Sequence, residues 1–318
     1  MLLALLTACG GTAAEAPLGT ANRAADRTTQ SEQLATAAEP ASTAATPATN
    51  DAASTSPPAP ASARAENSAT AGGETRATRL SIFAAASLAD AFDEISRGFE
   101  ANNPGVSLSF NYGGSNQLAQ QIVQGAPVDV FASANQRQMD VVIESGQVVS
   151  TTQRTFVRNR LVVVFPADNP AKIRTLNDLA KPGIKLVLAA EAVPVGQYAL
   201  DFLQKASEAA EFTETYREMV LANVVSYEEN VRAVLSKVEL GEADAGIVYT
   251  SDISGDAADR VGDLDIPDEL NTIAAYPIAP IKEGNNAAMA QRFVDYVLSE
   301  AGQAVLAGYG FIPAAADE

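Results

Sequence analysis

The sequence contains no histidine and only one cysteine, Cys9, among its 318 residues. Histidine is the usual general base near neutral pH and a frequent transition-metal ligand, so its absence removes both roles. A single cysteine allows neither an intrachain disulfide nor a cysteine-rich metal site. We therefore expect no metal coordinated directly by side chains, and no cofactor.

Positive charge is also scarce. The chain has 21 lysine and arginine residues against 39 aspartate and glutamate residues, which gives a formal net charge of −18. Nucleic acids and anionic membrane surfaces are bound through basic patches, so neither is an expected partner. No stretch approaches the roughly 20 apolar residues that a membrane-spanning helix needs.

The single cysteine ends a short apolar run and lies in the sequence LLTACG, residues 5–10. This context resembles the lipobox of bacterial lipoproteins, in which the cysteine is lipidated and becomes the first mature residue. Residues 1–8 would then be a lipoprotein signal segment, truncated-looking because no lysine or arginine precedes Cys9. The alternative is an ordinary cysteine. We expect the lipid, which would be the only membrane anchor.

The segment from residue 9 to residue 78 is rich in alanine, threonine, serine, glutamate and proline, and the first aromatic residue of the chain is Phe83. A segment with no aromatic and few branched apolar side chains cannot bury enough surface to offset the entropy of ordering. We predict that residues 9–78 form a disordered tether.

From residue 79 onward, short apolar runs alternate with amphipathic stretches. The runs that predict strands are residues 80–83, 106–110, 128–131, 161–165, 186–188 and 245–249. Between them, apolar residues recur at helical spacing, as they do from Leu88 to Phe99. Strands that alternate with helices predict an α/β fold with mainly parallel sheets.

Several of the expected strand-to-helix turns carry unusually small side chains. FAAASL at residues 83–88, GGS at 113–115 and PVG at 194–196 each open an amphipathic stretch. A fourth turn, residues 226–231, is less bare because it contains Glu228 and Glu229. Helix starts offer free backbone N–H groups and the positive end of the helix dipole, and small side chains let an anion approach them. These turns predict an anion site made of amides and hydroxyls.

Ser87 has two interpretations. Serine is a strong N-cap, and Asp90 three residues later is a capping-box-like partner, so Ser87 could simply cap a helix. Alternatively, its hydroxyl is part of the anion site. Catalysis is not expected there, because the Gly-x-Ser-x-Gly, P-loop and dinucleotide-binding glycine patterns are all absent.

Six motifs follow one another between residues 83 and 311: FAAASL (83–88), GAPVDVF (125–131), LVVV (161–164), VPVG (193–196), GIVY (246–249) and YGF (309–311). In sequence and order they resemble the ModA-type molybdate-binding proteins, the extracytoplasmic solute receptors of ABC importers. The resemblance implies a two-lobed α/β periplasmic-binding-protein fold of the type II-like, Venus-flytrap kind, with a mixed, mainly parallel sheet in each lobe. Residues 79–159 and 277–318 would form lobe 1, and residues 160–276 would form lobe 2.

The resemblance also implies the ligand contacts. Ser87 and Ser115 would donate through their hydroxyls and amides, Val195 and Val231 through their backbone amides, and Tyr249 through its hydroxyl. The ligand would be molybdate or tungstate, captured between the lobes as an oxyanion and delivered to a membrane permease. We expect a monomer outside the cytoplasm.

Ligand chemistry leaves alternatives open. A cavity with donors only suits a fully deprotonated dianion such as molybdate, whereas hydrogen phosphate carries a proton and needs an acceptor. Sulfate offers the same four acceptors on a smaller scale, so a sulfate receptor on the same fold is one alternative. A carboxylate-dependent enzyme and a structural surface lipoprotein are two others.

Four carboxylates lie near the predicted loops: Asp129, Asp252, Glu228 and Glu229. We expect Asp129 and Asp252 to hold loop backbone. Glu228 and Glu229 are expected to face solvent, with a contribution to ligand coordination left open.

Overall fold

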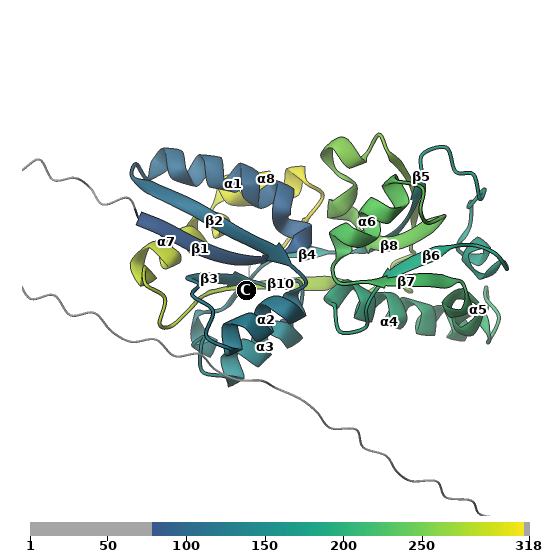
Figure 1. Ribbon diagram of the computed structural model, residues 1–318, viewed down its shortest axis with the longest axis horizontal. Coiled ribbons are helices and arrows are strands. Elements are labelled where there is room, and N and C mark those ends of the chain that lie inside the picture. The colour runs from purple at the N-terminus through teal and green to yellow at the C-terminus, as the bar shows by residue number, and fades with distance from the viewer. Residues whose placement is uncertain (1–77, 315–318) are drawn as a thin grey trace, which may run out of the picture. The chain divides into compact units, whose positions relative to one another are not determined.

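The computed structural model describes residues 78–314. The predicted signal segment, Cys9 and nearly all of the predicted tether lie outside the described residues. Strand β1 begins at Thr78, the last residue of the predicted tether. The described chain forms two lobes, each built on one sheet with helices on both faces (Figure 1).

The sheet of lobe 1, called sheet A, has six strands in the order β11-β4-β10-β3-β1-β2. Their bounds are β1 Thr78–Ala85, β2 Val106–Gly113, β3 Val130–Ala132, β4 Arg154–Asn159, β10 Ala274–Pro280 and β11 Ile312–Pro313. Helices α1, α7 and α8 cover one face, and α2 and α3 the other (Figure 1). Their bounds are α1 Ala89–Asn102, α2 Ser115–Val123, α3 Gln136–Glu144, α7 Ala287–Leu298 and α8 Glu300–Gly308.

The sheet of lobe 2, called sheet B, has five strands in the order β7-β6-β8-β5-β9. Their bounds are β5 Leu161–Pro166, β6 Leu186–Ala189, β7 Val224–Glu228, β8 Ala245–Tyr249 and β9 Val261–Asp265. The helices of this lobe are α4 Pro194–Glu208, α5 Tyr216–Ala222 and α6 Val231–Glu239. Short 3₁₀ turns complete the two lobes at Ala86–Leu88, Ser150–Thr152, Leu176–Ala180, Thr250–Ile253 and Gly255–Ala257.

Both sheets are mixed, which agrees with the prediction, and every predicted strand is present. Of the nine strand pairings in the described chain, four are parallel and five antiparallel, so the parallel pairings do not dominate as expected. All five antiparallel pairings involve β4, β5 or β10, the strands that lead into or out of the two chain passages between the sheets. The parallel pairs include β1 with β2 and β6 with β7, and in each of these a helical connection lies between the two strands. Parallel neighbours need such a crossover connection.

The chain crosses between the sheets twice. It passes from β4 to β5 through Arg160, and it returns over residues 266–273 into β10. Because Ala274 already pairs with Asn159 of β4, the first residues of β10 belong to sheet A and not to the predicted lobe 2 range of 160–276.

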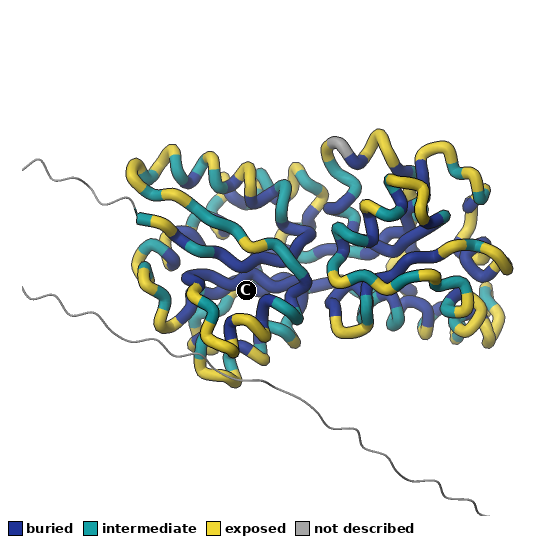
Figure 2. Tube along the Cα trace, in the orientation of Figure 1, coloured by how far each residue is buried: buried dark blue, intermediate teal, exposed yellow. Residues whose placement is uncertain are grey.

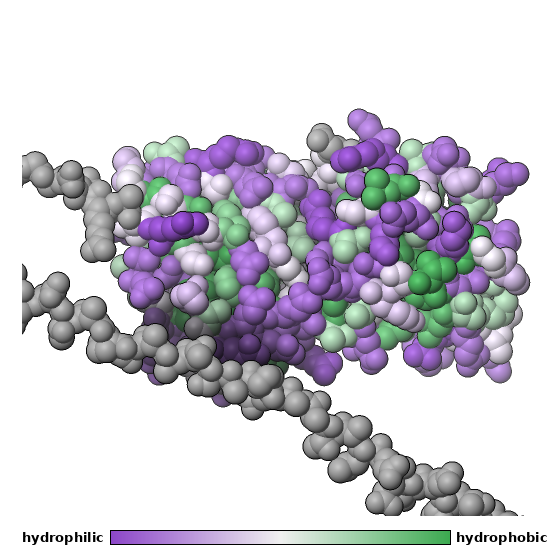
Figure 3. All heavy atoms as spheres, in the orientation of Figure 1, coloured by the Kyte–Doolittle hydropathy of each residue, from purple (hydrophilic) through white to green (hydrophobic). Residues whose placement is uncertain are grey.

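Buried residues follow the strands of both sheets (Figure 2), and most of them are apolar. In lobe 1, Phe92 of α1 packs against Phe156 and Phe293 at ring-centroid distances of 5.9 Å each. In lobe 2, Leu161–Val164 of β5 are all buried, as expected for a strand covered on both faces. The visible surface is mainly polar with several apolar areas, one of them near the edge strand β7, where Val225 is exposed (Figure 3).

We predict that Gly302→Ala destabilises the fold by about 1–3 kcal/mol, a typical cost of overpacking. A Cβ on Gly302 of α8 would lie 2.4 Å from the carbonyl oxygen of Tyr296 at the end of α7, so the two helices would have to move apart. Urea unfolding measures the cost. Gly308→Ala in the same helix is the matched control, because a Cβ there meets nothing within 4 Å. Equal losses in both variants would contradict the packing argument.

Candidate functional site

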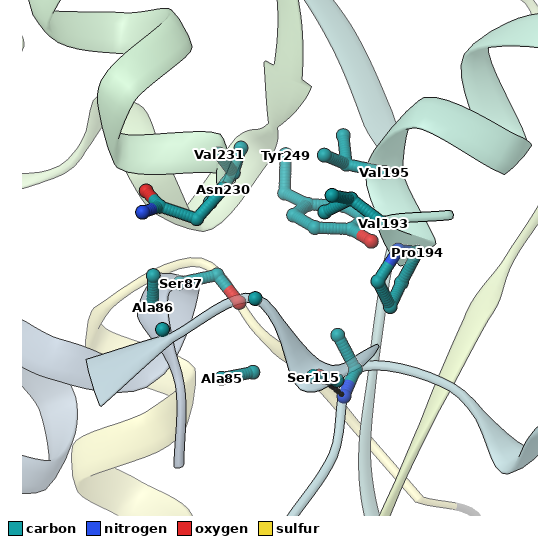
Figure 4. Close-up of a pocket in the computed structure, with 13 residues that line it drawn as sticks. Ala85, Ala86, Ser87, Ser115, Val193, Pro194, Val195, Asn230, Val231 and Tyr249 are labelled. Carbon is teal, nitrogen blue, oxygen red and sulfur yellow. Dashed lines mark hydrogen bonds between the residues drawn. The ribbon is translucent and has the colours of Figure 1, made fainter. Parts of the chain in front are cut away.

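Turns from both lobes meet around one small cavity (Figure 4). From lobe 1 come the turns after β1, β2 and β3, and from lobe 2 the turns before α4 and α6 and the end of β8. The lining residues are Ala85, Ala86, Ser87, Gly113, Gly114, Ser115, Ala134, Val193, Pro194, Val195, Asn230, Val231 and Tyr249. No charged side chain is among them.

All five residues predicted to contact the ligand line this cavity: Ser87, Ser115, Val195, Val231 and Tyr249. Each is at most 4% exposed. The structure therefore brings together residues that lie far apart in the sequence, and it encloses them.

Three helices begin at the cavity. Helix α2 begins at Ser115, α4 begins at Pro194 with Val195 in its first turn, and α6 begins at Val231. Backbone N–H groups of a first helical turn have no partner within the helix, and the helix dipole places partial positive charge there. The cavity is therefore favourable for an anion although no cationic side chain lines it.

The Ser115 hydroxyl is set up as a donor. Its oxygen accepts the backbone N–H of Ala134 at 3.0 Å. A backbone N–H can only donate, so the proton of the Ser115 hydroxyl must point elsewhere. Since Ser115 lines the cavity, its O–H can be given to a ligand there.

Ser87 is not a helix cap. It lies inside the 3₁₀ turn Ala86–Leu88, and the N-cap of α1 is Leu88, which makes no side-chain capping bond. The Ser87 oxygen lies instead 2.9 Å from the hydroxyl of Tyr276. Asp90, the expected capping partner, binds Arg232 of α6 at 2.7 Å. The capping interpretation is therefore wrong: the extra turn moves the helix start past Ser87.

The hydroxyl of Tyr249 is buried and has no hydrogen-bond partner among residues 78–314. Burial raises the pKa of Tyr249 well above its ordinary value, so the group keeps its proton. Figure 4 shows the ring reaching into the space between the turns of Ser87 and Pro194. A buried hydroxyl without a partner costs about 1–3 kcal/mol, which an acceptor in the cavity would remove.

Asp129 and Asp252 hold backbone, as expected. The Ser81 N–H donates to Asp129 Oδ2 at 2.8 Å, and the Tyr249 N–H donates to Asp252 Oδ2 at 3.0 Å. Burial raises the pKa of Asp252 to about 6, against the opposing effect of Arg232, whose Nε lies 3.2 Å from Asp252 Oδ1. Neither carboxylate lines the cavity.

Glu228 and Glu229 also lie outside the cavity lining. Glu228 was expected to face solvent, but its side chain is only 14% exposed because it pairs with Lys237 of α6 at 3.1 Å. The exposed Glu229 accepts a hydrogen bond of 3.4 Å from Gln117 of α2. Both side chains are therefore directed to neighbouring residues.

The two lobes touch at the rim of the cavity. Arg232 of lobe 2 binds Asp90 of lobe 1, and Gln117 of lobe 1 binds Glu229 of lobe 2. Gly114 approaches the Glu229 carbonyl so closely that an added Cβ would lie 2.5 Å from its oxygen. These contacts define a closed arrangement of the lobes.

Sequence reasoning missed three residues that shape the site: Ala134, Asn230 and Tyr276. Asn230 lines the cavity and caps α6, because its side-chain oxygen accepts the Ala233 N–H at 3.0 Å. Asparagine before an amphipathic stretch is an N-cap signal that could have been found. Ala134 and Tyr276 act through contacts across the fold, which no local pattern shows.

Two lobes joined by two chain crossings, with a cavity between them, are typical of solute-binding proteins. The match to known families agrees: residues 80–312 match the family described as bacterial extracellular solute-binding protein, and the chain belongs to it. Its relatives are solute-binding transport proteins and not enzymes, and membership places the chain outside the cytoplasm. Among residues 78–314, no helix is both long and apolar enough to cross a bilayer.

Individual relatives are similar over most of the chain. The molybdate-binding protein ModA of Mycobacterium tuberculosis (strain ATCC 25618 / H37Rv) is 38% identical over 244 residues, which are 77% of this chain and 88% of the relative. The solved substrate-binding domain of a putative molybdenum ABC transporter from Clostridium difficile is 32% identical, with a TM-score of 0.57 over 75% of this chain and all of that domain. The sulfate-binding protein SubI of M. tuberculosis H37Rv, at 19% identity and a TM-score of 0.66 over 74% of this chain and 87% of its own, shares the fold.

We predict that Gly114→Ala weakens anion binding at least about tenfold while the ligand-free protein stays folded. The added methyl would collide with the Glu229 carbonyl across the lobe interface and hold the lobes apart, so that donors from the two sides could not reach one ligand. Isothermal titration calorimetry measures the affinity, and thermal unfolding without ligand checks the fold.

The matched control is Gly113→Ala. A Cβ on Gly113 lies 3.5 Å from its nearest neighbour, the Leu118 side chain, which is an ordinary contact distance. This variant should bind like the wild type. Wild-type affinity in Gly114→Ala would show that the Gly114 contact does not govern closure.

Proposed function

We propose that this chain is the molybdate receptor of an ABC importer: it captures molybdate between its lobes and delivers it to a membrane permease. Tungstate, an oxyanion of the same charge and shape, would bind in the same way. The observation that carries the proposal is the small cavity between the lobes, which is lined by Ser87, Ser115, Tyr249 and three helix starts and by no charged side chain. The 38% identity to a protein named molybdate-binding supports the same ligand. The oxyanion is cargo, and no further cofactor is needed.

The donors divide between the lobes. Lobe 1 would provide the hydroxyls and amides of Ser87 and Ser115, and lobe 2 the amides of Val195 and Val231 and the hydroxyl of Tyr249. A ligand held by both sides stabilises the closed arrangement over an open one, because the open arrangement offers it only half of the contacts. The receptor would work as a monomer, since both halves of the site come from one chain.

Protonation distinguishes molybdate from phosphate. Molybdate is fully deprotonated at neutral pH, so each of its oxygens is an acceptor for a donor of the cavity. Hydrogen phosphate brings one proton that needs an acceptor, and the nearby carboxylates, Asp129, Asp252, Glu228 and Glu229, lie outside the lining. An unpaired buried donor costs about 1–3 kcal/mol, so phosphate should bind far more weakly.

Sulfate is the second candidate. It is also fully deprotonated, and the fold is shared with a sulfate-binding protein. Only the size of the cavity separates the two anions, because their hydrogen-bonding needs are equal.

Calorimetry with molybdate, tungstate, sulfate and phosphate tests the proposal directly. We expect tight binding of molybdate and tungstate, weaker binding of sulfate and none of phosphate. Tight sulfate binding without molybdate binding would make the protein a sulfate receptor. Absence of binding by all four anions would reject the oxyanion function.

We predict that Ser87→Ala weakens molybdate binding by about 10- to 100-fold, the worth of a hydrogen bond to a charged group. Ser87→Asp should nearly abolish binding, because it places a carboxylate against a dianion. Both affinities are measured by calorimetry, with Ser96→Ala of α1 as control, since the Ser96 hydroxyl bonds only to the Asp93 carbonyl away from the cavity. Near-wild-type affinity in Ser87→Asp would place Ser87 outside the site.

We further propose that Cys9 carries the lipid that holds the receptor at the outer face of the cell membrane, near its permease. The support is the LLTACG sequence at residues 5–10. We predict that Cys9→Ala moves the protein from the membrane fraction to the soluble fraction, measured by fractionation and immunoblotting, with Ser87→Ala as a control that keeps the anchor. An unchanged distribution would contradict lipidation at Cys9.

A further inference from the structure

Tyr276 lies directly behind the cavity without lining it. It is fully buried on β10, and its ring makes edge contacts with Tyr249, Phe156 and Phe311 at centroid distances of 5.8, 6.4 and 5.6 Å. The ring is therefore fixed in place by neighbours on several sides. Its hydroxyl is close to two polar groups, Ser87 Oγ at 2.9 Å and Asn159 Nδ2 at 3.4 Å.

The orientation of the Asn159 amide is determined by its surroundings. The backbone N–H of Arg160 points at one end of the amide at 3.0 Å, and the Thr250 hydroxyl donates to the same atom at 3.0 Å. A backbone N–H can only donate, so this end must be the oxygen. The NH₂ end then faces Ser251 Oγ at 2.8 Å and the Tyr276 oxygen.

The direction of the next hydrogen bond follows. The Asn159 NH₂ group is a donor, so it cannot accept the proton of the Tyr276 hydroxyl. Burial raises the pKa of Tyr276, so the proton stays on the oxygen. The neighbouring Tyr249 hydroxyl makes no hydrogen bond, so Ser87 Oγ, at 2.9 Å, is the acceptor that remains for it.

Once Ser87 accepts this bond, its own proton has to point away from Tyr276, and Ser87 lines the cavity. We propose that Tyr276 is a positioning residue that fixes the Ser87 hydroxyl as a hydrogen-bond donor to the bound oxyanion. The inference rests on the proposed function, because it assumes an oxyanion at Ser87. It makes Ser87 equivalent to Ser115, whose oxygen is occupied by the Ala134 N–H in the same manner.

The positions of these residues connect the site to the lobe crossings. Asn159 is the last residue of β4, directly before the first crossing, and Tyr276 follows the second crossing by a few residues on β10. Their strands pair with one another in sheet A, with Ala274 opposite Asn159 and Tyr276 opposite Val157. The donor direction at Ser87 is therefore set by the two strands through which the chain passes between the lobes.

A double-mutant cycle tests the inference. Molybdate affinity is measured by calorimetry for the wild type, Tyr276→Phe, Ser87→Ala and the double variant. Tyr276→Phe removes the hydroxyl and keeps the ring, so the Ser87 proton becomes free to turn away from the ligand. We expect a loss of affinity of about 5- to 20-fold in the wild-type background and almost none in the Ser87→Ala background, since residues that act through one another are not additive.

Tyr216→Phe is the matched control. Tyr216 is equally buried, and its hydroxyl donates to the Leu176 carbonyl at 2.7 Å in lobe 2, away from the cavity. It should lower the ligand-free melting temperature about as much as Tyr276→Phe does and leave the affinity unchanged.

The outcomes separate the two hypotheses. An equal affinity loss from Tyr276→Phe with and without Ser87 would show that Tyr276 acts through packing. Unchanged affinity in Tyr276→Phe would show that Tyr276 has no effect on binding. Either result overturns the inference about Tyr276 but does not contradict the proposed function. If the wild type binds sulfate in place of molybdate, the proposed ligand is wrong, and the same cycle with sulfate still decides the role of Tyr276. If no oxyanion binds, both the proposed function and the proposed role of Tyr276 are rejected.

Discussion

Hydrogen-bond donors that are buried without acceptors are the constraint on which the site depends. The closed lobes enclose the first-turn amides of three helices and the unpartnered hydroxyl of Tyr249. In an open arrangement water would satisfy these groups, so closure without a ligand carries their desolvation cost. An anion with acceptors on every side removes that cost. In the proposed function, ligand binding and lobe closure would therefore be coupled, because an acceptor in the cavity favours the closed arrangement.

Two carboxylates near the cavity hold the loop backbone, and neither of them lines the cavity. Asp252 holds the backbone N–H of Tyr249, and Asp129 holds that of Ser81, so negative charge orients the loops without facing the ligand. The net charge of −18 therefore does not oppose anion binding, since the local field comes from oriented amides and helix starts. Small side chains at Ala85, Ala86 and Gly114 leave those amides accessible.

Local patterns were sufficient to predict the bare turns and six of the eleven strands of the described chain, because alternating apolar runs and helix-start residues are properties of short segments. Strands β4, β7, β9, β10 and β11 were not predicted. The five residues predicted to contact the ligand followed from a family resemblance, and all five line one cavity. Two further points, the role of Ser87 and the partner of Asp90, depend on structure that a local pattern does not show. Ser87 was open to interpretation as a cap because a 3₁₀ turn before α1 has no clear sequence signal, and Asp90 was assigned to that cap although its partner, Arg232, is 142 residues away. Tyr276 was missed for the same reason, since it meets Ser87 only through the pairing of β10 in sheet A.

Two different features of the structure then decide between anions. The directions of the hydroxyl protons distinguish deprotonated from protonated oxyanions, and these directions are set within the lobes by Ala134 on Ser115 and by Tyr276 on Ser87. In the proposed function, anion size would be distinguished by how closely the lobes approach, and Gly114 is in close contact with the Glu229 carbonyl at their interface. Donors fixed on two rigid lobes keep their directions but change their separation as the lobes move. If the proposed function holds, size selectivity between molybdate and sulfate would depend on the lobe interface, and discrimination against phosphate would depend on the hydrogen bonds behind each serine.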